Sequence, residues 1–166
     1  STCSDLAKIF QTQNTVLPVF GPGTAALEMG ITSTLAPGDE IVIPATGRFA
    51  QRLTEVAQGA QLTVHTVKVE PYKPVVLKEF QATLDKHPKT QAVALVQHET
   101  GIGLINPVRE LCQAARERGI LTIVDAVSSL GGLEILVDDW GIDICVGVAN
   151  KCIGAPIGIA PMTVSE

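Results

Sequence analysis

The sequence predicts an α/β protein in which helices cover both faces of a mainly parallel β-sheet. Apolar segments of strand length alternate with helix-like segments roughly every 25 to 30 residues, as in folds built from β-α-β units. Several of the strand segments are mostly apolar, as in strands covered on both faces, and 121–124, which is apolar apart from Thr122, is the clearest of them. We therefore expect residues 1–166 to form one domain, a three-layer sandwich.

Composition and charge exclude several classes of function. A chain of 166 residues can bury the core of one domain. Its 12 Lys and Arg residues against 17 Asp and Glu residues give a net charge of -5, with no basic run, which argues against nucleic acid or an anionic membrane surface as a partner. No apolar run approaches the roughly 20 residues of a membrane span, and no signal peptide opens the chain. We expect a cytoplasmic protein, with an organellar location as the alternative.

The cysteines predict neither a disulfide framework nor a metal site. No two of them form a Cys-x-x-Cys pair, and no histidine stands at metal-ligand spacing from them. They are therefore interpreted as reduced thiols of an intracellular type of protein. The four residues are Cys3, Cys112, Cys145 and Cys152.

The chain is predicted to begin with a short helix and a strand. Ser4 should cap the helix, whose apolar residues recur at helical spacing up to Phe10. The strand at 16–20 contains Pro18, which lacks a backbone N–H and so favours a position at the edge of the sheet. A glycine-rich turn then leads into a helix that ends near Leu35.

The middle of the chain continues the alternation. A strand is expected at 40–44, followed by a helix that carries Phe49 and ends at Gly59. The segment 62–69 alternates apolar and polar residues, as an outer strand would, and 75–86 has apolar residues at helical spacing. These elements fit one β-α-β-α series.

The second half predicts a strand at 92–97 and the clearest helix of the chain. Asn106 should cap this helix, Pro107 should open it and Gly119 should close it, which is the asymmetry typical of helix ends. The further strands are expected at 121–124, 142–148 and 158–162.

The glycine-rich turn at Gly21–Ala26 suggests a phosphate site. Small residues between a strand and a helix let backbone N–H groups approach a phosphate, and the helix start adds a favourable dipole. The turn also matches the dinucleotide fingerprint G-x-G-x-x-G/A, which predicts an acidic residue at the end of the second strand. Pro44, Ala45 and Thr46 stand there instead. A nicotinamide cofactor and a purely structural turn remain the alternatives.

Lys151 and Asp125 indicate the chemistry of the site. Lys151 interrupts an apolar run, 146–160, where an ammonium should be costly to desolvate, so a Schiff base with a carbonyl is one interpretation. A lysine that reaches from a loop into solvent is the other.

Asp125 ends an apolar strand, either as a helix cap or as the partner of a cation. Pyridoxal phosphate requires a lysine amine that forms a Schiff base with it and a carboxylate that pairs with its pyridine nitrogen. Phe49 could cover the ring of this cofactor.

Five candidate segments follow predicted strand ends. In an open α/β sheet, ligands bind beyond the carboxyl ends of the strands. We therefore expect these five segments to meet at one site. They are Gly21–Thr24, Thr46–Phe49, His98–Thr100, Asp125–Val127 and Lys151.

In these landmarks the chain resembles the large domain of class V, fold-type I pyridoxal-phosphate aminotransferases. The resemblance extends over nearly all residues and is closest to the alanine-glyoxylate, serine-pyruvate and ureidoglycine-glyoxylate group. Its specificity lies in the order and spacing of the landmarks. They are Gly21–Glu28, Thr46–Phe49, His98–Thr100, Val124–Ser129 and Asn150–Pro156.

The resemblance implies a role for each residue of the site. Lys151 would form the Schiff base and Asp125 would keep the ring nitrogen protonated. Gly23, Thr24 and Asn150 would hold the phosphate, Phe49 and Val127 would cover the two faces of the ring, and Thr100 would approach the ring hydroxyl. Core packing is the alternative for Phe49 and Val127. His98 and Glu99 are expected to shape the loop, His65 and His87 to be surface residues and Cys152 to be a packed thiol.

The implied activity is transamination between a small amino acid and a 2-oxo acid such as glyoxylate or pyruvate, in a homodimer that binds pyridoxal 5'-phosphate. The family's small C-terminal domain, with its carboxylate-binding arginine, and its N-terminal arm have no counterpart in this sequence. Pro22 and Ala149 stand where the family often has serine, and 101–103 departs from a Ser-Thr-Gly-like segment. We therefore expect a fragment that binds the cofactor weakly and turns over slowly or not at all.

Two further interpretations remain open. The chain could be a non-catalytic fold-type I remnant or interaction fragment whose lysine no longer reacts. It could also be related to a class V lyase or cysteine desulfurase, which would need a mobile catalytic cysteine beyond Lys151.

Overall fold

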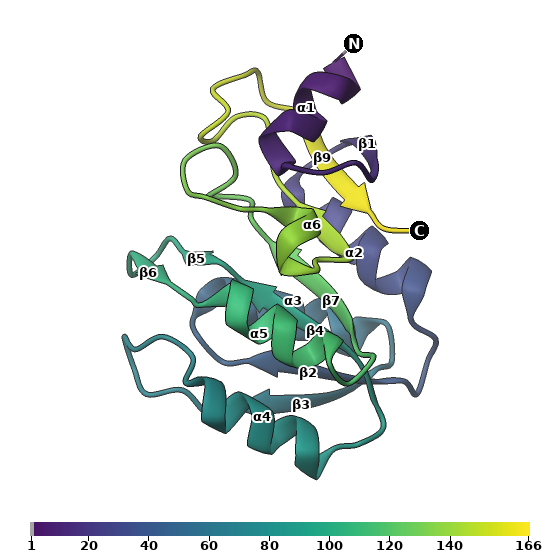
Figure 1. The fold of residues 1–166 in the computed structure, drawn as a ribbon, viewed down its shortest axis with the longest axis vertical. Coiled ribbons are helices and arrows are strands. Elements are labelled where there is room, and N and C mark those ends of the chain that lie inside the picture. Colours follow the sequence, from purple (N-terminus) through teal and green to yellow (C-terminus); the bar gives the residue numbers. More distant parts are fainter. Residues whose placement is uncertain (1) are drawn as a thin grey trace.

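The protein folds around a seven-stranded sheet, described over residues 2–166 in a computed structural model (Figure 1). The strands lie in the order β1-β9-β8-β7-β4-β2-β3. Only β9 runs antiparallel to its two neighbours, so the other six strands share one direction. The strands are β1 (Thr15–Phe20), β2 (Glu40–Pro44), β3 (Thr63–Val67), β4 (Thr90–Val96), β7 (Leu121–Asp125), β8 (Ile144–Val146) and β9 (Ile159–Val164), beside a small hairpin of β5 (His98–Glu99) and β6 (Leu104–Ile105).

Helices cover both faces of this sheet. Residues of α4, α5 and α6 form one apolar core with one sheet face, and residues of α2 and α3 form a second core with the other face. In Figure 1 the ribbons of α4 and α5 lie in front of the strands that they cover. The three-layer, mainly parallel sandwich is therefore confirmed. The helices are α1 (Thr2–Phe10), α2 (Gly23–Thr34), α3 (Arg48–Gly59), α4 (Leu77–Lys86), α5 (Val108–Arg116) and α6 (Val137–Trp140).

The two edge strands are those that the sequence marks as outer strands. β1, which contains Pro18, lies at one edge, and β3, with its alternating pattern, lies at the other. Pro18 faces Pro161 in the register of β1 with β9, so each strand carries its proline at the same position of the ladder. A proline costs one backbone donor, and this cost is smallest at the edge.

Two predicted helix caps are wrong. Ser4 lies inside α1, which already begins at Thr2. Asn106 does not cap α5, because its side chain is buried and used elsewhere: Nδ2 donates to the Val96 carbonyl at 2.8 Å, and Oδ1 accepts from the Val75 N–H at 3.2 Å. The amide thus ties the end of β4 to the loop before α4.

No helix within residues 2–166 is both long enough and apolar enough to span a membrane. The four cysteines carry free thiols, as predicted, and no disulfide joins them. Cys112 and Cys145 are buried in the core, and burial raises the pKa of both thiols.

Candidate active site

The predicted site residues lie at the carboxyl end of the parallel sheet. Five strands that run in the same direction stop there, and the chain leaves each of them through a loop that carries one of the predicted segments (Figure 1). This end is where an open α/β sheet leaves room for a ligand. The strand ends are Phe20, Pro44, Val96, Asp125 and Val146.

One pocket joins three of the predicted segments. It has a volume of about 390 Å³ and brings the start of α2 together with the loop after β7 and the loop after β8. Gly23, Val127, Asn150 and Lys151 are the predicted residues among those that line it. The full lining is Gly21, Pro22, Gly23, Val127, Val148, Asn150, Lys151, Ile157 and Gly158. Thr24, the next residue of α2, is half-buried beside it.

Lys151 is exposed, so the prediction of a costly, desolvated ammonium is wrong. The chain is buried through Ala149 and then turns outward. The Gly154 N–H donates to the Lys151 carbonyl at 3.0 Å, and the Ala155 N–H donates to the Ala149 carbonyl at 2.9 Å. These two bonds close a loop, although the apolar residues of this segment suggest buried structure. The amine therefore stands at the pocket wall, open to solvent. Cys152 in the same loop is also exposed rather than packed.

Gly23 touches Val127 so closely that no side chain fits between them. A Cβ on Gly23 would lie 2.5 Å from Val127 Cγ2. The close approach sets the first turn of α2 directly against the loop after β7. The first turn of a helix leaves its N–H groups without intrahelical partners, and its dipole favours an anion there. The turn is thus suited to a phosphate group.

Asp125 carries a buried carboxyl group at the end of β7. Burial raises its pKa to about 6, with the nearby Glu99 carboxylate acting in the same direction and the hydrogen bond from Val127 opposing both. Oδ1 accepts the Val127 N–H at 2.9 Å. No residue within 2–166 donates a hydrogen bond to Oδ2. A cationic N–H donor would therefore both satisfy this oxygen and stabilise the charged form.

Glu99 organises the neighbouring helix. Its carboxylate is 1% exposed and accepts hydrogen bonds from Thr46 Oγ1 at 3.0 Å and from the N–H groups of Phe49 and Ala50 at 3.1 and 2.9 Å. It therefore satisfies orphan donors in the first turn of α3 and matches the positive helix end. A Cβ on Gly47 would lie 2.8 Å from Glu99 Oε2, so a larger residue there would displace the carboxylate.

Phe49 and Thr100 line a second pocket rather than the pocket of Lys151. This second pocket has a volume of about 320 Å³ and also includes Arg48, Arg52 and Gly101. The Phe49 side chain is 37% exposed, so its ring does not belong to the packed core, and Val127 is half-buried. Core packing is therefore the weaker interpretation for Phe49.

Hydrogen bonds hold the two loops after β4 and β7 together. His98 Nδ1 lies 3.0 Å from Ser128 Oγ, which also donates to the His98 carbonyl at 3.1 Å. Ser129 Oγ donates to Gln97 Oε1 at 2.6 Å within the buried region. His98 thus shapes the loop, as predicted. No sequence pattern indicates the bond between Gln97 and Ser129, because the two residues are 32 positions apart and meet only in the folded chain.

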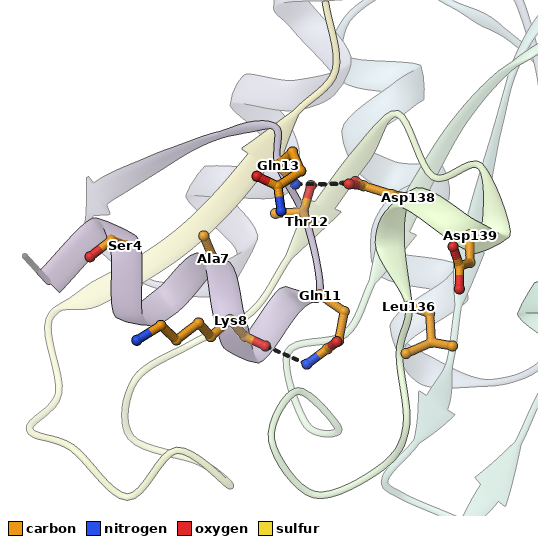
Figure 2. Close-up of a pocket in the computed structure, with 9 residues that line it drawn as sticks. All are labelled: Ser4, Ala7, Lys8, Gln11, Thr12, Gln13, Leu136, Asp138 and Asp139. Carbon is orange, nitrogen blue, oxygen red and sulfur yellow. Dashed lines mark hydrogen bonds between the residues drawn. The ribbon is translucent and has the colours of Figure 1, made fainter.

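A pocket at the other end of the sheet contains none of the predicted site residues. Figure 2 shows it between α1 and the segment of α6, with a volume of about 520 Å³. Asp138 accepts hydrogen bonds there from Thr12 Oγ1 and from the Gln13 N–H. Thr12 precedes β1 and α6 precedes β8, which places this pocket at the amino end of the strands. Its polar groups connect α1 to α6.

The pocket of Lys151, together with Asp125, which accepts a hydrogen bond from the lining residue Val127, has groups suited to a flat heteroaromatic phosphate ester. A helix start favours an anion, a buried carboxylate can accept the N–H of a protonated ring nitrogen, and a solvent-open primary amine can attack a carbonyl carbon. These three groups belong to Gly23, Asp125 and Lys151. The residues present therefore fit the cofactor that the sequence analysis expects.

Comparisons with known proteins give a consistent result. Residues 2–166 match the family described as aminotransferase class-V. The chain is 38% identical over 168 residues to an uncharacterized aminotransferase of Methanocaldococcus jannaschii, covering 99% of this chain and 43% of that protein. It is 37% identical over 166 residues to the (S)-ureidoglycine–glyoxylate transaminase of Bacillus subtilis, covering 99% and 40%.

A solved structure has the same fold. The alanine–glyoxylate aminotransferase from Nostoc sp. matches with a TM-score of 0.94 and 34% identity, over 99% of this chain and 44% of that chain. The present chain thus spans about two-fifths of the length of the proteins that it resembles.

Proposed function

We propose that this chain, which belongs to the class V aminotransferase family and has the fold of the fold-type I large domain, is the cofactor-binding part of a pyridoxal-phosphate-dependent aminotransferase. The observation that carries the proposal is the pocket in which Lys151 faces the start of α2 and the loop after Asp125. Residues 1–166 would be the large domain. The proposed reaction is transamination between a small amino acid and a 2-oxo acid such as glyoxylate or pyruvate, in a homodimer.

The proposed roles follow the chemistry of each group. Lys151 would hold pyridoxal 5'-phosphate through its amine, and Asp125 Oδ2 would accept the N–H of the pyridine ring. The phosphate would be bound by the backbone N–H groups of Gly23 and Thr24, with the Asn150 side chain beside it. Phe49 and Val127 would cover the ring faces, and Thr100 would approach the ring hydroxyl. The exposure of Phe49 and the half-burial of Val127 support surfaces that are available to a ligand.

When bound, the cofactor would supply an electron sink for a carbanion at the substrate α-carbon. Asp125 would stabilise the positive ring nitrogen, because a buried carboxylate beside a cation gains far more than one beside water. Lys151 Nζ would move the proton at the α-carbon once it is free as a neutral amine. Glu99 would act indirectly, because its hydrogen bonds fix the first turn of α3 and thereby the position of Phe49.

A cofactor titration tests the proposal. Adding pyridoxal 5'-phosphate in excess to the chain should produce the visible absorbance of a protonated Schiff base. Lys151→Arg keeps the positive charge but cannot form that bond, so the absorbance should be lost. Lys78→Arg, at an exposed position of α4, serves as the matched control and should behave as the wild type. Equal absorbance in Lys151→Arg and the wild type would reject Lys151 as the cofactor lysine.

A further inference from the structure

Two histidines and a glutamate meet on the far side of the molecule from the pocket of Lys151. Glu40 begins β2, His65 lies in β3 and His87 follows the last turn of α4. His65 Nε2 and Glu40 Oε2 are 2.8 Å apart, and the two imidazole rings stack with centroids 3.6 Å apart at 12°. One ligand atom from each residue lies within 4.8 Å of the other two.

The backbone places these side chains toward the amino end of the sheet. Glu40 pairs with Thr63 in the register of β2 with β3, so His65 stands two residues further along the neighbouring strand, on the same face. Residues of α4 pack over this face, and His87 at the end of that helix closes the group. Glu40 begins β2 and Pro44 ends it, so the cluster lies at the opposite end of this strand from the candidate active site.

The three side chains are half-buried, which distinguishes them from freely solvated groups. The exposed fractions of the His65 and Glu40 side chains are 19% and 24%, and His87 is also half-buried. His65 and His87 thus lie at the surface, as expected, but are only partly exposed. Two imidazoles and one carboxylate in a partly dehydrated group form a donor set that divalent transition metals prefer.

We propose that Glu40, His65 and His87 bind one divalent transition-metal ion of the Zn²⁺ type, with water in the remaining position. Nitrogen and oxygen ligands lie about 2.0–2.2 Å from zinc, so neighbouring ligand atoms are roughly 3.3–3.6 Å apart in a tetrahedral centre. His65 Nε2 and Glu40 Oε2 share a hydrogen bond at 2.8 Å, so an ion that replaces the shared proton would move these two atoms slightly apart.

The remaining adjustment concerns His87. Parallel stacked rings do not direct both lone pairs at one ion, because imidazole binds metals in the plane of its ring. The site closes when the His87 side chain rotates out of the stack. His87 stands at the C-cap of α4, outside the regular helix, and its side chain is only partly buried. The ion would fasten the end of α4 to the strands β2 and β3.

A zinc titration of the full chain, first freed of metal by a chelator, tests the proposal. The affinity is measured by competition with a chromophoric zinc chelator, and the thermal midpoint of unfolding is followed with and without zinc. Wild-type chain should bind one ion and unfold at a higher temperature with zinc. His65→Gln and His87→Gln should weaken binding by more than about tenfold and lose the thermal shift.

Controls separate this site from other zinc ligands. His98→Gln replaces the third histidine of the chain and should leave zinc binding unchanged. Cys3→Ser with Cys152→Ser removes both exposed thiols and should also leave it unchanged. Circular dichroism checks that each variant is folded. The proposal is overturned if folded wild-type chain binds no zinc, if His65→Gln and His87→Gln bind it as wild type does, or if the thiol variant alone loses it.

Discussion

The Glu99 carboxylate accepts the backbone N–H of Phe49 at 3.1 Å, across 50 residues of sequence. Glu99 belongs to the short strand β5, and Phe49 belongs to the first turn of α3. This bond, with those from Ala50 and Thr46, fixes the start of α3 beside the carboxyl end of the sheet. The position of the proposed ring-covering residue thus depends on a buried carboxylate that need not touch the cofactor.

Glu99→Gln should therefore destabilise the fold. A glutamine presents only one acceptor oxygen and turns an NH₂ group toward donors, so a buried N–H or hydroxyl loses its partner. The expected loss in the free energy of unfolding is about 1–3 kcal/mol, measured by urea titration. Cofactor affinity should fall as well, because Phe49 loses its anchor.

Glu70→Gln is the matched control, because Glu70 is exposed in the loop after β3. This control should change stability by less than about 0.5 kcal/mol. If Glu99→Gln has the same small effect, the carboxylate does not hold α3 in place.

Asp125→Asn should separate stability from cofactor binding. The Asp125 pKa is raised from 3.8 to about 6 by burial. Between these values the folded state binds more protons than the unfolded state, so wild-type stability should fall as pH rises through this interval. Near neutral pH the charged Asp125 carboxylate lowers the free energy of unfolding by on the order of 3 kcal/mol, and an uncharged asparagine avoids this loss. The cofactor-free variant should therefore be the more stable chain near neutral pH, and it should bind the cofactor more weakly.

Urea titrations at several pH values between 3.8 and about 6 measure this effect. The advantage of Asp125→Asn over the wild type should grow as pH rises. Glu134→Gln removes an exposed carboxylate and should change stability by less than about 0.5 kcal/mol near neutral pH. An advantage that shrinks with rising pH would contradict the buried, uncompensated carboxyl group.

Gly23→Ala should lower stability because the new methyl group would collide with Val127 Cγ2. Overpacking of this kind costs about 1–3 kcal/mol. Val127→Ala removes the obstructing methyls, so the double variant should recover part of the loss, which a double-mutant cycle in urea measures. Gly59→Ala, where a Cβ meets nothing within 4 Å, should be close to neutral. Additive effects of Gly23→Ala and Val127→Ala would show that the two residues do not limit each other.

The fold could be predicted from sequence because its signals are local. Alternating apolar segments give the strands and helices, and Pro18 alone indicates an edge strand. The cap at Asn106 could not be predicted, because its amide is used by Val96 and Val75, and only the folded chain brings these together.

The location of the predicted site residues at one end of the sheet could be predicted from the sequence, but their exposures could not. The residues around Lys151 are apolar, which resembles buried structure, yet Ile157 in this loop is 82% exposed. Local hydrophobicity therefore does not report burial there. Glu99, and the group of Glu40, His65 and His87, depend on contacts between distant segments, and no spacing in the sequence indicates them.

The proposed function depends on the binding of pyridoxal 5'-phosphate by the Lys151 amine. Its most direct test is to incubate the chain with the cofactor, reduce the mixture with borohydride, digest it and locate the pyridoxyl group by mass spectrometry. We expect one dominant modified residue, Lys151, and no modification at that position in Lys151→Arg. Labelling spread evenly over the exposed lysines, with no preference for Lys151, would contradict it.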